Sequence, residues 1–182
     1  LFLGSLLVVA YREVQTERQH SGKVRPIVPA DSRECVDCHS KTTPGIMGQW
    51  QESKHALHGI GCLSCHVAAQ GDVDGFIHHG VRIATIVSPN DCARCHPKET
   101  KELAGSRHAD AANFAGSLDS FLGQMVESDT TSTIGCQGCH GSVVKLLGEG
   151  KLDPATWPNG GVGRVNPDGS KGSCAACHYR HD

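Results

Sequence analysis

The chain has 182 residues, a length that suits one ordinary domain. Only 4% of its residues are aromatic and 22 are glycine, so the sequence is short of side chains for a packed apolar core. The formal net charge is −2 and no basic stripe of the kind found in nucleic-acid-binding proteins is present, so we expect no nucleic-acid partner.

The first ten residues, Leu1 to Ala10, form an apolar run that ends at Tyr11-Arg12. A bilayer takes about 20 residues to span, so this run alone is too short. We expect residues 1–11 to be the end of a membrane anchor or of an export signal, and a buried strand or helix is the alternative. Residues 12–34 are polar, contain Pro26 and Pro29, and predict an extended linker that includes His20.

From Cys35 onward, the unit Cys-x-x-Cys-His occurs five times. Its cysteines are Cys35 and Cys38, Cys62 and Cys65, Cys92 and Cys95, Cys136 and Cys139, and Cys174 and Cys177. Its histidines are His39, His66, His96, His140 and His178. This unit is the attachment signature of c-type haem. Two thiols three positions apart add to the two vinyl groups of the porphyrin, and the following histidine becomes the fifth ligand of the iron.

Zinc and disulfides are the alternatives for so many cysteines. Five units cannot all pair as four-cysteine zinc sites, and each unit is followed directly by histidine. All ten cysteines belong to the motif, so none is left for a disulfide elsewhere. The sequence therefore predicts five haem c groups, with many of the 17 Lys and Arg pairing with their propionates.

We expect residues 35–182 to form a pentahaem domain that is mainly α-helical, with long loops and little β-structure. Five stacked haems would supply the apolar bulk that the side chains lack, so the fold should depend on haem insertion.

Local patterns predict the elements of this domain. A helix over residues 44–58 should begin with Thr43 as its cap and Pro44 at its first position, and should end at Gly59. The other expected elements are a loop at 67–80, an extended segment at 81–87, a turn at 88–91, helices at 97–104 and 114–125, an apolar piece at 143–147, and a long loop at 148–173.

Seven histidines lie outside the motifs and are candidates for the sixth iron ligand or for a distal pocket. We favour His55, one of His78 and His79, His108, and His181. His20 and His58 are weaker candidates, and Met47 and Met125 are expected to fill the core. His181 is too close in sequence to His178 to reach the opposite face of the same ring, so it should serve a neighbouring haem.

Three stretches of this sequence resemble the octahaem hydroxylamine oxidoreductase family. They are residues 42–56 (TTPGIMGQWQESKHA), residues 106–109 (SRHA), and residues 156–170 (TWPNGGVGRVNPDGS) running into Cys174 and on to His181. The resemblance covers most of residues 35–181 and corresponds to the first five of the eight haems of that family. It implies a helical, haem-packed fold and periplasmic nitrogen chemistry.

In that family the fourth haem is catalytic and has an open distal face. The resemblance implies that the corresponding haem in this sequence is attached to Cys136 and Cys139 and ligated by His140, with His181 close to it. The resemblance implies that hydroxylamine or hydrazine is oxidised there, while some relatives reduce nitrite or hydroxylamine. The last three haems of the family have no counterpart in this sequence. The crosslinking tyrosine of the oxidising enzymes has none either, since neither Tyr11 nor Tyr179 stands in the region that would match it.

Two interpretations stay open: a piece of a longer enzyme, or a five-haem relative that kept the electron-transfer half. We expect an exported cytochrome in the periplasm or outside the cell that transfers electrons to other redox proteins or further haem subunits, as an oligomer. The alternative to catalysis is a bis-histidine electron wire in a membrane complex or a cytochrome filament. A structural or sensory haem module is a third class.

Overall fold

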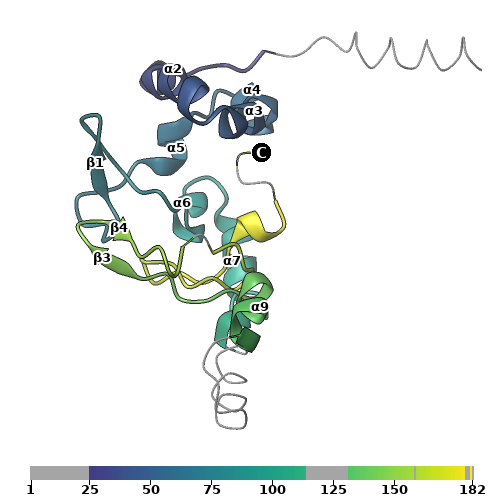
Figure 1. The fold of residues 1–182 in the computed structure, drawn as a ribbon. Coiled ribbons are helices and arrows are strands. Elements are labelled where there is room, and N and C mark those ends of the chain that lie inside the picture. Colours follow the sequence, from purple (N-terminus) through teal and green to yellow (C-terminus); the bar gives the residue numbers. More distant parts are fainter. Residues whose placement is uncertain (1–24, 114–130, 158, 179–180, 182) are drawn as a thin grey trace, which may run out of the picture.

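The computed structural model describes residues 25–113, 131–157, 159–178 and 181. The apolar segment 1–11, most of the predicted linker with His20, and the helix expected at 114–125 with Met125 lie outside these residues. Within them, helices are short and are joined by long loops (Figure 1).

Helices α2 (Arg33–Thr42), α3 (Pro44–Glu52) and α4 (Lys54–Leu57) group at one end of the molecule, after the 3₁₀ turn η1 (Ala30–Ser32) (Figure 1). Their core consists of Met47, Trp50 and Ala56, with Val28 and Val36 packed against it. The indole Nε1 of Trp50 donates a hydrogen bond to the carbonyl oxygen of Ile60 at 3.0 Å. The expectation that Met47 fills the core is therefore confirmed.

The helix predicted over residues 44–58 is two helices, and that prediction is wrong at Ser53. Ser53 has extended backbone (φ −74°, ψ 155°), and its Oγ accepts a hydrogen bond from the backbone N–H of Ala56 at 3.0 Å. Serine side chains compete with the helical hydrogen-bond pattern in this way, so Ser53 ends α3 and caps α4. Gly59 follows α4 with a φ of +72°, as a residue past a helix end often does.

The second motif lies on helix α5 (Cys62–His66), and a hairpin of strands β1 (Phe76–His78) and β2 (Val81–Ile83) follows. The strands pair antiparallel, with His78 opposite Val81. His79 and Gly80 form the two-residue turn, both at positive φ. The segment 67–80 is therefore not all loop, and the extended segment 81–87 is a strand only at its start.

The remaining helices and strands lie within and between the last three motifs. They are α6 (Pro89–Ala93), α7 (Pro97–Ala104), α9 (Thr131–His140), β3 (Leu146–Gly148), β4 (Lys151–Leu152) and the 3₁₀ turn η2 (Cys174–Ala176). Helix α7 confirms the prediction for 97–104. The expected turn at 88–91 is the start of α6: Ser88 and Asp91 form a capping box there. The predicted loop at 148–173 contains β4.

The two hairpins lie next to each other, because the turn between β3 and β4 touches the loop before β1: a Cβ at Gly150 would be 2.9 Å from the carbonyl oxygen of Gly75. Helix α9 lies at the end of the molecule opposite to α2, α3 and α4 (Figure 1). In the part of the chain that the structure describes, five apolar residues are buried outside the first core: Ala68, Ala84, Ile86, Ala109 and Val144. The prediction of a mainly α-helical fold with long loops and little β-structure is confirmed.

We expect Ser53→Ala to lower the free energy of unfolding by about 1 kcal/mol, because it removes the cap of α4 and leaves a buried N–H without its acceptor. Ser53 is 1% exposed, so water cannot replace that acceptor. Denaturant unfolding of the holoprotein, followed by circular dichroism, measures the change. Gln51→Ala, at an exposed position of α3, is the control and should leave the stability within about 0.5 kcal/mol. Equal losses in the two variants would contradict the cap.

Candidate haem-attachment sites

Each Cys-x-x-Cys-His motif lies on or next to a short helix. The first motif lies on α2 and the second on α5, and the third runs from α6 into the turn after it. The fourth motif forms the end of α9, and the fifth begins in η2. Residues i and i+3 of a helical turn lie on one face, so the two thiols of a motif point the same way. The side chains of all ten cysteines are half-buried or exposed, and none forms a disulfide. This donor set fits a porphyrin that is bonded at two thiols and ligated by the next histidine.

Two motif histidines lie opposite histidines from outside the motifs. The ring centroids of His39 and His78 are 6.2 Å apart, and those of His55 and His96 are 6.1 Å apart. A metal–imidazole bond is about 2.0 Å long and the ring centroid lies roughly 1 Å behind the ligating nitrogen, so two axial imidazoles on one metal have centroids about 6 Å apart. Both pairs thus have the spacing of the two axial ligands of a single iron.

The rings of two motif histidines are oriented by hydrogen bonds at Nδ1. His66 Nδ1–H donates to the carbonyl oxygen of Ala84 at 2.9 Å. His39 Nδ1 lies 2.9 Å from Thr43 Oγ1, whose hydroxyl donates to the carbonyl oxygen of His39. A hydrogen bond at Nδ1 fixes the tautomer and leaves Nε2 to ligate a metal. Thr43 therefore orients the candidate ligand His39, while its expected role as a side-chain cap of α3 is not observed.

The attachment thiols of different motifs come together. Cys35 is hydrogen-bonded to Cys62, and burial together with this neighbour raises the pKa of the Cys62 thiol to about 11. The Cys92 thiol donates to Cys174, which raises the pKa of Cys92 and lowers that of Cys174. Arg94, in the third motif, donates to the carbonyl oxygen of Cys65 at 3.1 Å. The first, second, third and fifth motifs are thereby neighbours in that order.

The glycine-rich segment 159–173 joins the fourth motif to the fifth. The backbone N–H of Val162 donates to the Cys139 carbonyl oxygen at 2.9 Å, and that of Ser173 donates to the Val162 carbonyl oxygen at 3.0 Å. Gly141, at a φ of +88°, and Gly161 cross so closely that a Cβ on Gly161 would overlap the backbone of Gly141. Only glycine allows the two chains to approach this far.

Asp168 ties the same segment to the third motif. Its carboxylate accepts hydrogen bonds from Ser88 Oγ at 2.7 Å and Asn90 Nδ2 at 2.9 Å, both at the start of α6. It also accepts from Ser170 Oγ at 2.6 Å. Burial raises the pKa of Asp168, but these hydrogen bonds outweigh burial and hold its pKa below the ordinary value. Asp168 is not one of the predicted site residues; its signals in the sequence are its place in the resembling stretch 156–170 and in a polar turn, Asn166 to Ser170.

The remaining predicted histidines are placed as follows. His79 is in the hairpin turn with its ring 4.6 Å from that of His78, and His58 Nδ1 donates to the Lys54 carbonyl oxygen at 2.8 Å. His108 is exposed in the turn after α7. His181 Nδ1 lies 3.4 Å from Gln49 Oε1 on α3, whereas His140 ends α9 at the other end of the molecule (Figure 1). The structure therefore does not bring His140 and His181 together.

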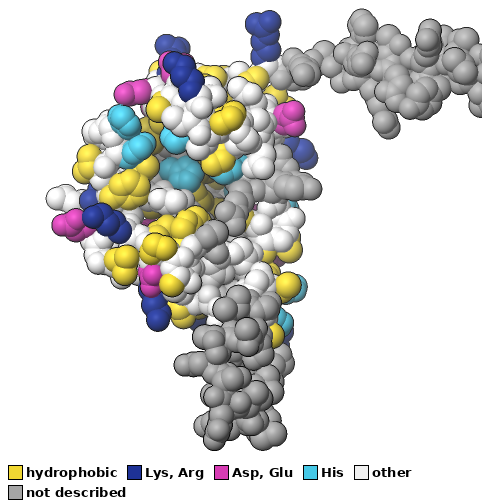
Figure 2. Space-filling model, viewed as in Figure 1, with side chains coloured by type: hydrophobic (Ala, Val, Ile, Leu, Met, Phe, Trp, Pro, Cys, Tyr) yellow, Lys and Arg dark blue, Asp and Glu magenta, His cyan; other side chains and the backbone are white. Residues whose placement is uncertain are grey.

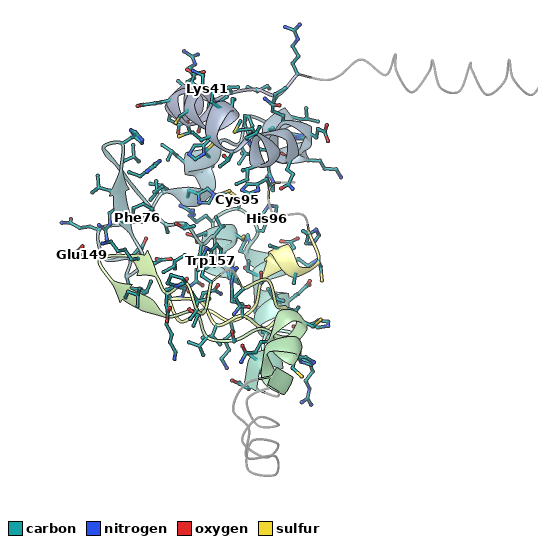
Figure 3. All side chains as sticks on the ribbon, in the orientation of Figure 1. Lys41, Phe76, Cys95, His96, Glu149 and Trp157 are labelled. Carbon is teal, nitrogen blue, oxygen red and sulfur yellow. The ribbon has the colours of Figure 1, made fainter. Side chains whose placement is uncertain are left out.

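Histidine and apolar side chains gather on one face of the molecule, between the α2 to α4 group and the hairpins (Figure 2). Cys95 and His96 lie in the middle of the molecule, between those helices and the lower part of the fold (Figure 3). Among the described residues, no cluster of three or more His, Cys, Asp or Glu has the arrangement of a metal site.

The family model for cytochrome c554 and c-prime matches residues 7–67, which include the first two motifs. A solved structure described as a hypothetical multiheme protein superimposes with a TM-score of 0.72 and 30% sequence identity, over 86% of this chain and 40% of its own. The chain is a multihaem c-type cytochrome. Proteins of this class carry covalently bound haem c, transfer electrons, and are typically periplasmic or extracellular.

Two curated relatives are larger multihaem proteins. The C-type polyheme cytochrome OmcB of Geobacter sulfurreducens is 32% identical over 162 residues, which cover 79% of this cytochrome and 19% of OmcB. The probable nitrite reductase-hydroxylamine oxidoreductase fusion protein of Kuenenia stuttgartiensis is 24% identical over 143 residues, covering 59% of this chain and 16% of its own. This cytochrome therefore spans less than a fifth of either relative.

No helix in the described part of this cytochrome has both the length and the apolar character to cross a membrane.

We expect Gly161→Ala to destabilise this cytochrome by about 3 kcal/mol, because the new methyl group would overlap the backbone of Gly141 beside the fourth motif. Gly48→Ala in α3 is the matched control: its Cβ would meet nothing within 4 Å and should stabilise the helix by about 0.5–1 kcal/mol. Thermal unfolding of the two holoproteins compares them. A Gly161→Ala variant as stable as the original protein would show that the crossing is not close in solution.

Proposed function

We propose that this chain holds five haem c groups, one at each Cys-x-x-Cys-His motif, and conducts electrons between redox partners. The observation that carries the proposal is the pairing of His39 with His78 and of His55 with His96 at the spacing of two axial ligands. An iron with histidine on both faces has no open position for a substrate, and it changes between ferric and ferrous forms by one electron. That chemistry is what the haems supply when bound.

The side chains of this chain hold the groups in series. His78 from β1 completes the site of the first motif, and His55 from α4 completes that of the third. Each pair links segments that are distant in the sequence. The contacts Cys35–Cys62 and Cys92–Cys174 bring the attachment edges of neighbouring haems together. Short distances between haem edges are what rapid electron transfer needs, so the order of motifs one, two, three and five is the proposed conducting path.

The axial pairs can be tested with matched neighbours in the sequence. His78→Ala should convert one haem from low spin to high spin and create a carbon monoxide site, whereas His79→Ala, one position along in the turn, should not. The same contrast is expected between His55→Ala and His58→Ala. Absorption and electron paramagnetic resonance spectra of the ferric protein measure the spin state, and pyridine haemochrome analysis measures the haem content. High-spin haem in the His79 or His58 variant, with none in its partner, would contradict the assignment.

The ring angles give a second readout of the same pairs. The imidazole planes of His55 and His96 are 78° apart, and those of His39 and His78 are 44° apart. Nearly perpendicular axial planes leave two iron d orbitals almost equal in energy, which produces a low-spin resonance signal with an unusually large maximum g value. We expect such a signal in the original protein, and its loss in His55→Ala but not in His78→Ala.

The second candidate function is reductive or oxidative nitrogen chemistry at the fourth motif. The match to a nitrite reductase-hydroxylamine oxidoreductase fusion protein favours it, as does the resemblance of residues 156–170 to hydroxylamine oxidoreductases. Here Cys136 and Cys139 would attach the haem, His140 would ligate its iron, and hydroxylamine, hydrazine or nitrite would be the substrate. His181 would act in the distal pocket only if the C-terminal segment moved from α3 to α9, or if a second chain supplied it.

Carbon monoxide binding by the reduced original protein separates the two functions. Binding to one haem in five, together with turnover of hydroxylamine or nitrite that is lost in His140→Ala, would support catalysis. A low-spin protein without carbon monoxide binding would leave the electron conductor alone. We further propose that this chain works outside the cytoplasm, with residues 1–11 as anchor or export signal. Its partners would be other redox proteins or further haem subunits, in a membrane complex or a filament.

A further inference from the structure

The ring of His78 has aromatic neighbours on its own hairpin. The centroid of the Phe76 ring lies 6.3 Å from that of His78, with the two planes 68° apart, and the His79 ring lies 4.6 Å away at 88°. Both arrangements are edge-to-face, a geometry that pairs of aromatic rings prefer. Phe76 is half-buried, whereas His79 is exposed in the turn. Phe76 is therefore the ring neighbour of His78 that the surrounding protein holds in place.

The pairing of the strands puts Phe76 on the same face of the hairpin as His78. The two residues are two positions apart in β1, so their side chains point the same way, toward the side on which His39 lies. Ile77, between them, points to the opposite face and is 66% exposed. Ile83 is the partner of Phe76 across the strands, and directly opposite residues share a face. Phe76 and Ile83 thus form an apolar pair beside His78.

The backbone at Phe76 is anchored on two sides. Its partner Ile83 also forms an antiparallel bridge with Val67, the residue directly after the second motif. The preceding residue, Gly75, touches the turn between β3 and β4, since a Cβ at Gly150 would be 2.9 Å from its carbonyl oxygen. These contacts hold Phe76 between two other segments of the fold. A ring held in this way can orient an exposed neighbouring ring.

An axial imidazole needs such orientation, because it has to present Nε2 to the iron. The χ2 torsion of histidine has only a broad preference, so packing and hydrogen bonds decide which way the ring faces. At His39 the hydrogen bond between Nδ1 and Thr43 Oγ1, at 2.9 Å, does this. At His78 the edge-to-face contact with Phe76 supplies an orienting contact of another kind. A ligand that is already oriented loses less entropy when it binds, so its bond to the metal is stronger.

We propose that Phe76 is a positioning residue for the second axial ligand of the first haem: its ring holds the imidazole of His78 in the orientation that faces His39. This inference rests on the proposed function, since it takes His39 and His78 as an axial pair. It goes further because it names the side chain that keeps His78 on the iron. The bond of His78 to the iron should therefore resist replacement by an added ligand, and that resistance should depend on the aromatic ring at position 76.

Cyanide is the probe, because it binds ferric haem and has to displace an axial imidazole to do so. Its carbon takes the position that the imidazole nitrogen leaves, and no electron is transferred. Phe76→Ala, in the full chain with its haems, should raise the cyanide affinity of the first haem about fivefold, which is within the range of one aromatic contact. An absorption titration of the ferric protein measures the affinity. His78→Ala identifies the haem, since its cyanide site is already open.

Ile77→Ala is the matched control, because Ile77 is the next residue along β1 and lies on the opposite face. It should change the cyanide affinity of the first haem less than twofold. Phe76→Tyr keeps the ring and should restore the affinity of the original protein. Phe76→Leu keeps an apolar side chain but no ring, so it should still bind cyanide more tightly than the original. The leucine variant keeps the test decisive if the alanine variant does not fold.

The low-spin resonance signal of the first haem gives a second readout, which a merely structural role of Phe76 would not move. It is the signal that His78→Ala removes, and its g values depend on the angle between the two imidazole planes, which is 44° here. We expect these g values to shift in Phe76→Ala and to stay the same in Ile77→Ala. The signal of the haem between His55 and His96 is an internal reference and should not change.

Two results would overturn the role of Phe76. One is an unchanged cyanide affinity in both Phe76→Ala and Phe76→Leu, and the other is an equal rise in Ile77→Ala. Failure of the proposed function looks different: His78→Ala would then open no cyanide site, and the assignment of His39 and His78 as an axial pair would be wrong.

Discussion

Close contact between the backbone segments that carry the Cys-x-x-Cys-His motifs is the constraint on which the rest of this structure depends. Among the described residues, the clustered apolar core is small: Met47, Trp50 and Ala56 at one end. Elsewhere the motif segments approach one another through glycine, as at Gly141 and Gly161, and through buried polar side chains such as Arg164. A protein built in this way relies on its covalent cofactor for apolar mass, much as small metal-binding domains rely on their metal.

Three polar side chains of the segment 159–173 each bind a residue close to the third or the fourth motif. Asp168 binds the start of α6, Arg164 binds the residue before the α6 cap, and Asn159 binds the residue that follows the fourth motif by two. All three belong to the glycine-rich stretch before the fifth motif. This stretch carries little regular structure, yet it fixes three attachment segments relative to one another, because each of its buried polar groups has a specific partner.

The sequence predicted the cofactor chemistry and the fold class well, since covalent attachment needs fixed residues at a fixed spacing. The helix at Pro97–Ala104 and the start of α3 at Pro44 were also predictable from local signals. The break at Ser53 was not, because a serine within an amphipathic pattern has no local mark that distinguishes a cap from a surface residue. The pairing of His78 with His39 could not be predicted, because it depends on the fold of the hairpin. The burial of Arg164 could not be predicted either, because the polar composition of its loop is typical of a solvent-exposed segment.

The strand register of the β1–β2 hairpin decides which side chain faces His39. Successive residues of a strand point to opposite faces, so a slip of one position in the pairing of β1 with β2 would turn His78 away and bring a neighbouring residue to His39. The turn at His79 and Gly80, with φ of +47° and +79°, allows only the register in which His78 lies opposite Val81. With His39 and His78 as the axial pair proposed above, strand register decides whether the first haem has its second histidine, so a slipped hairpin would change the absorption spectrum and spin state of that haem.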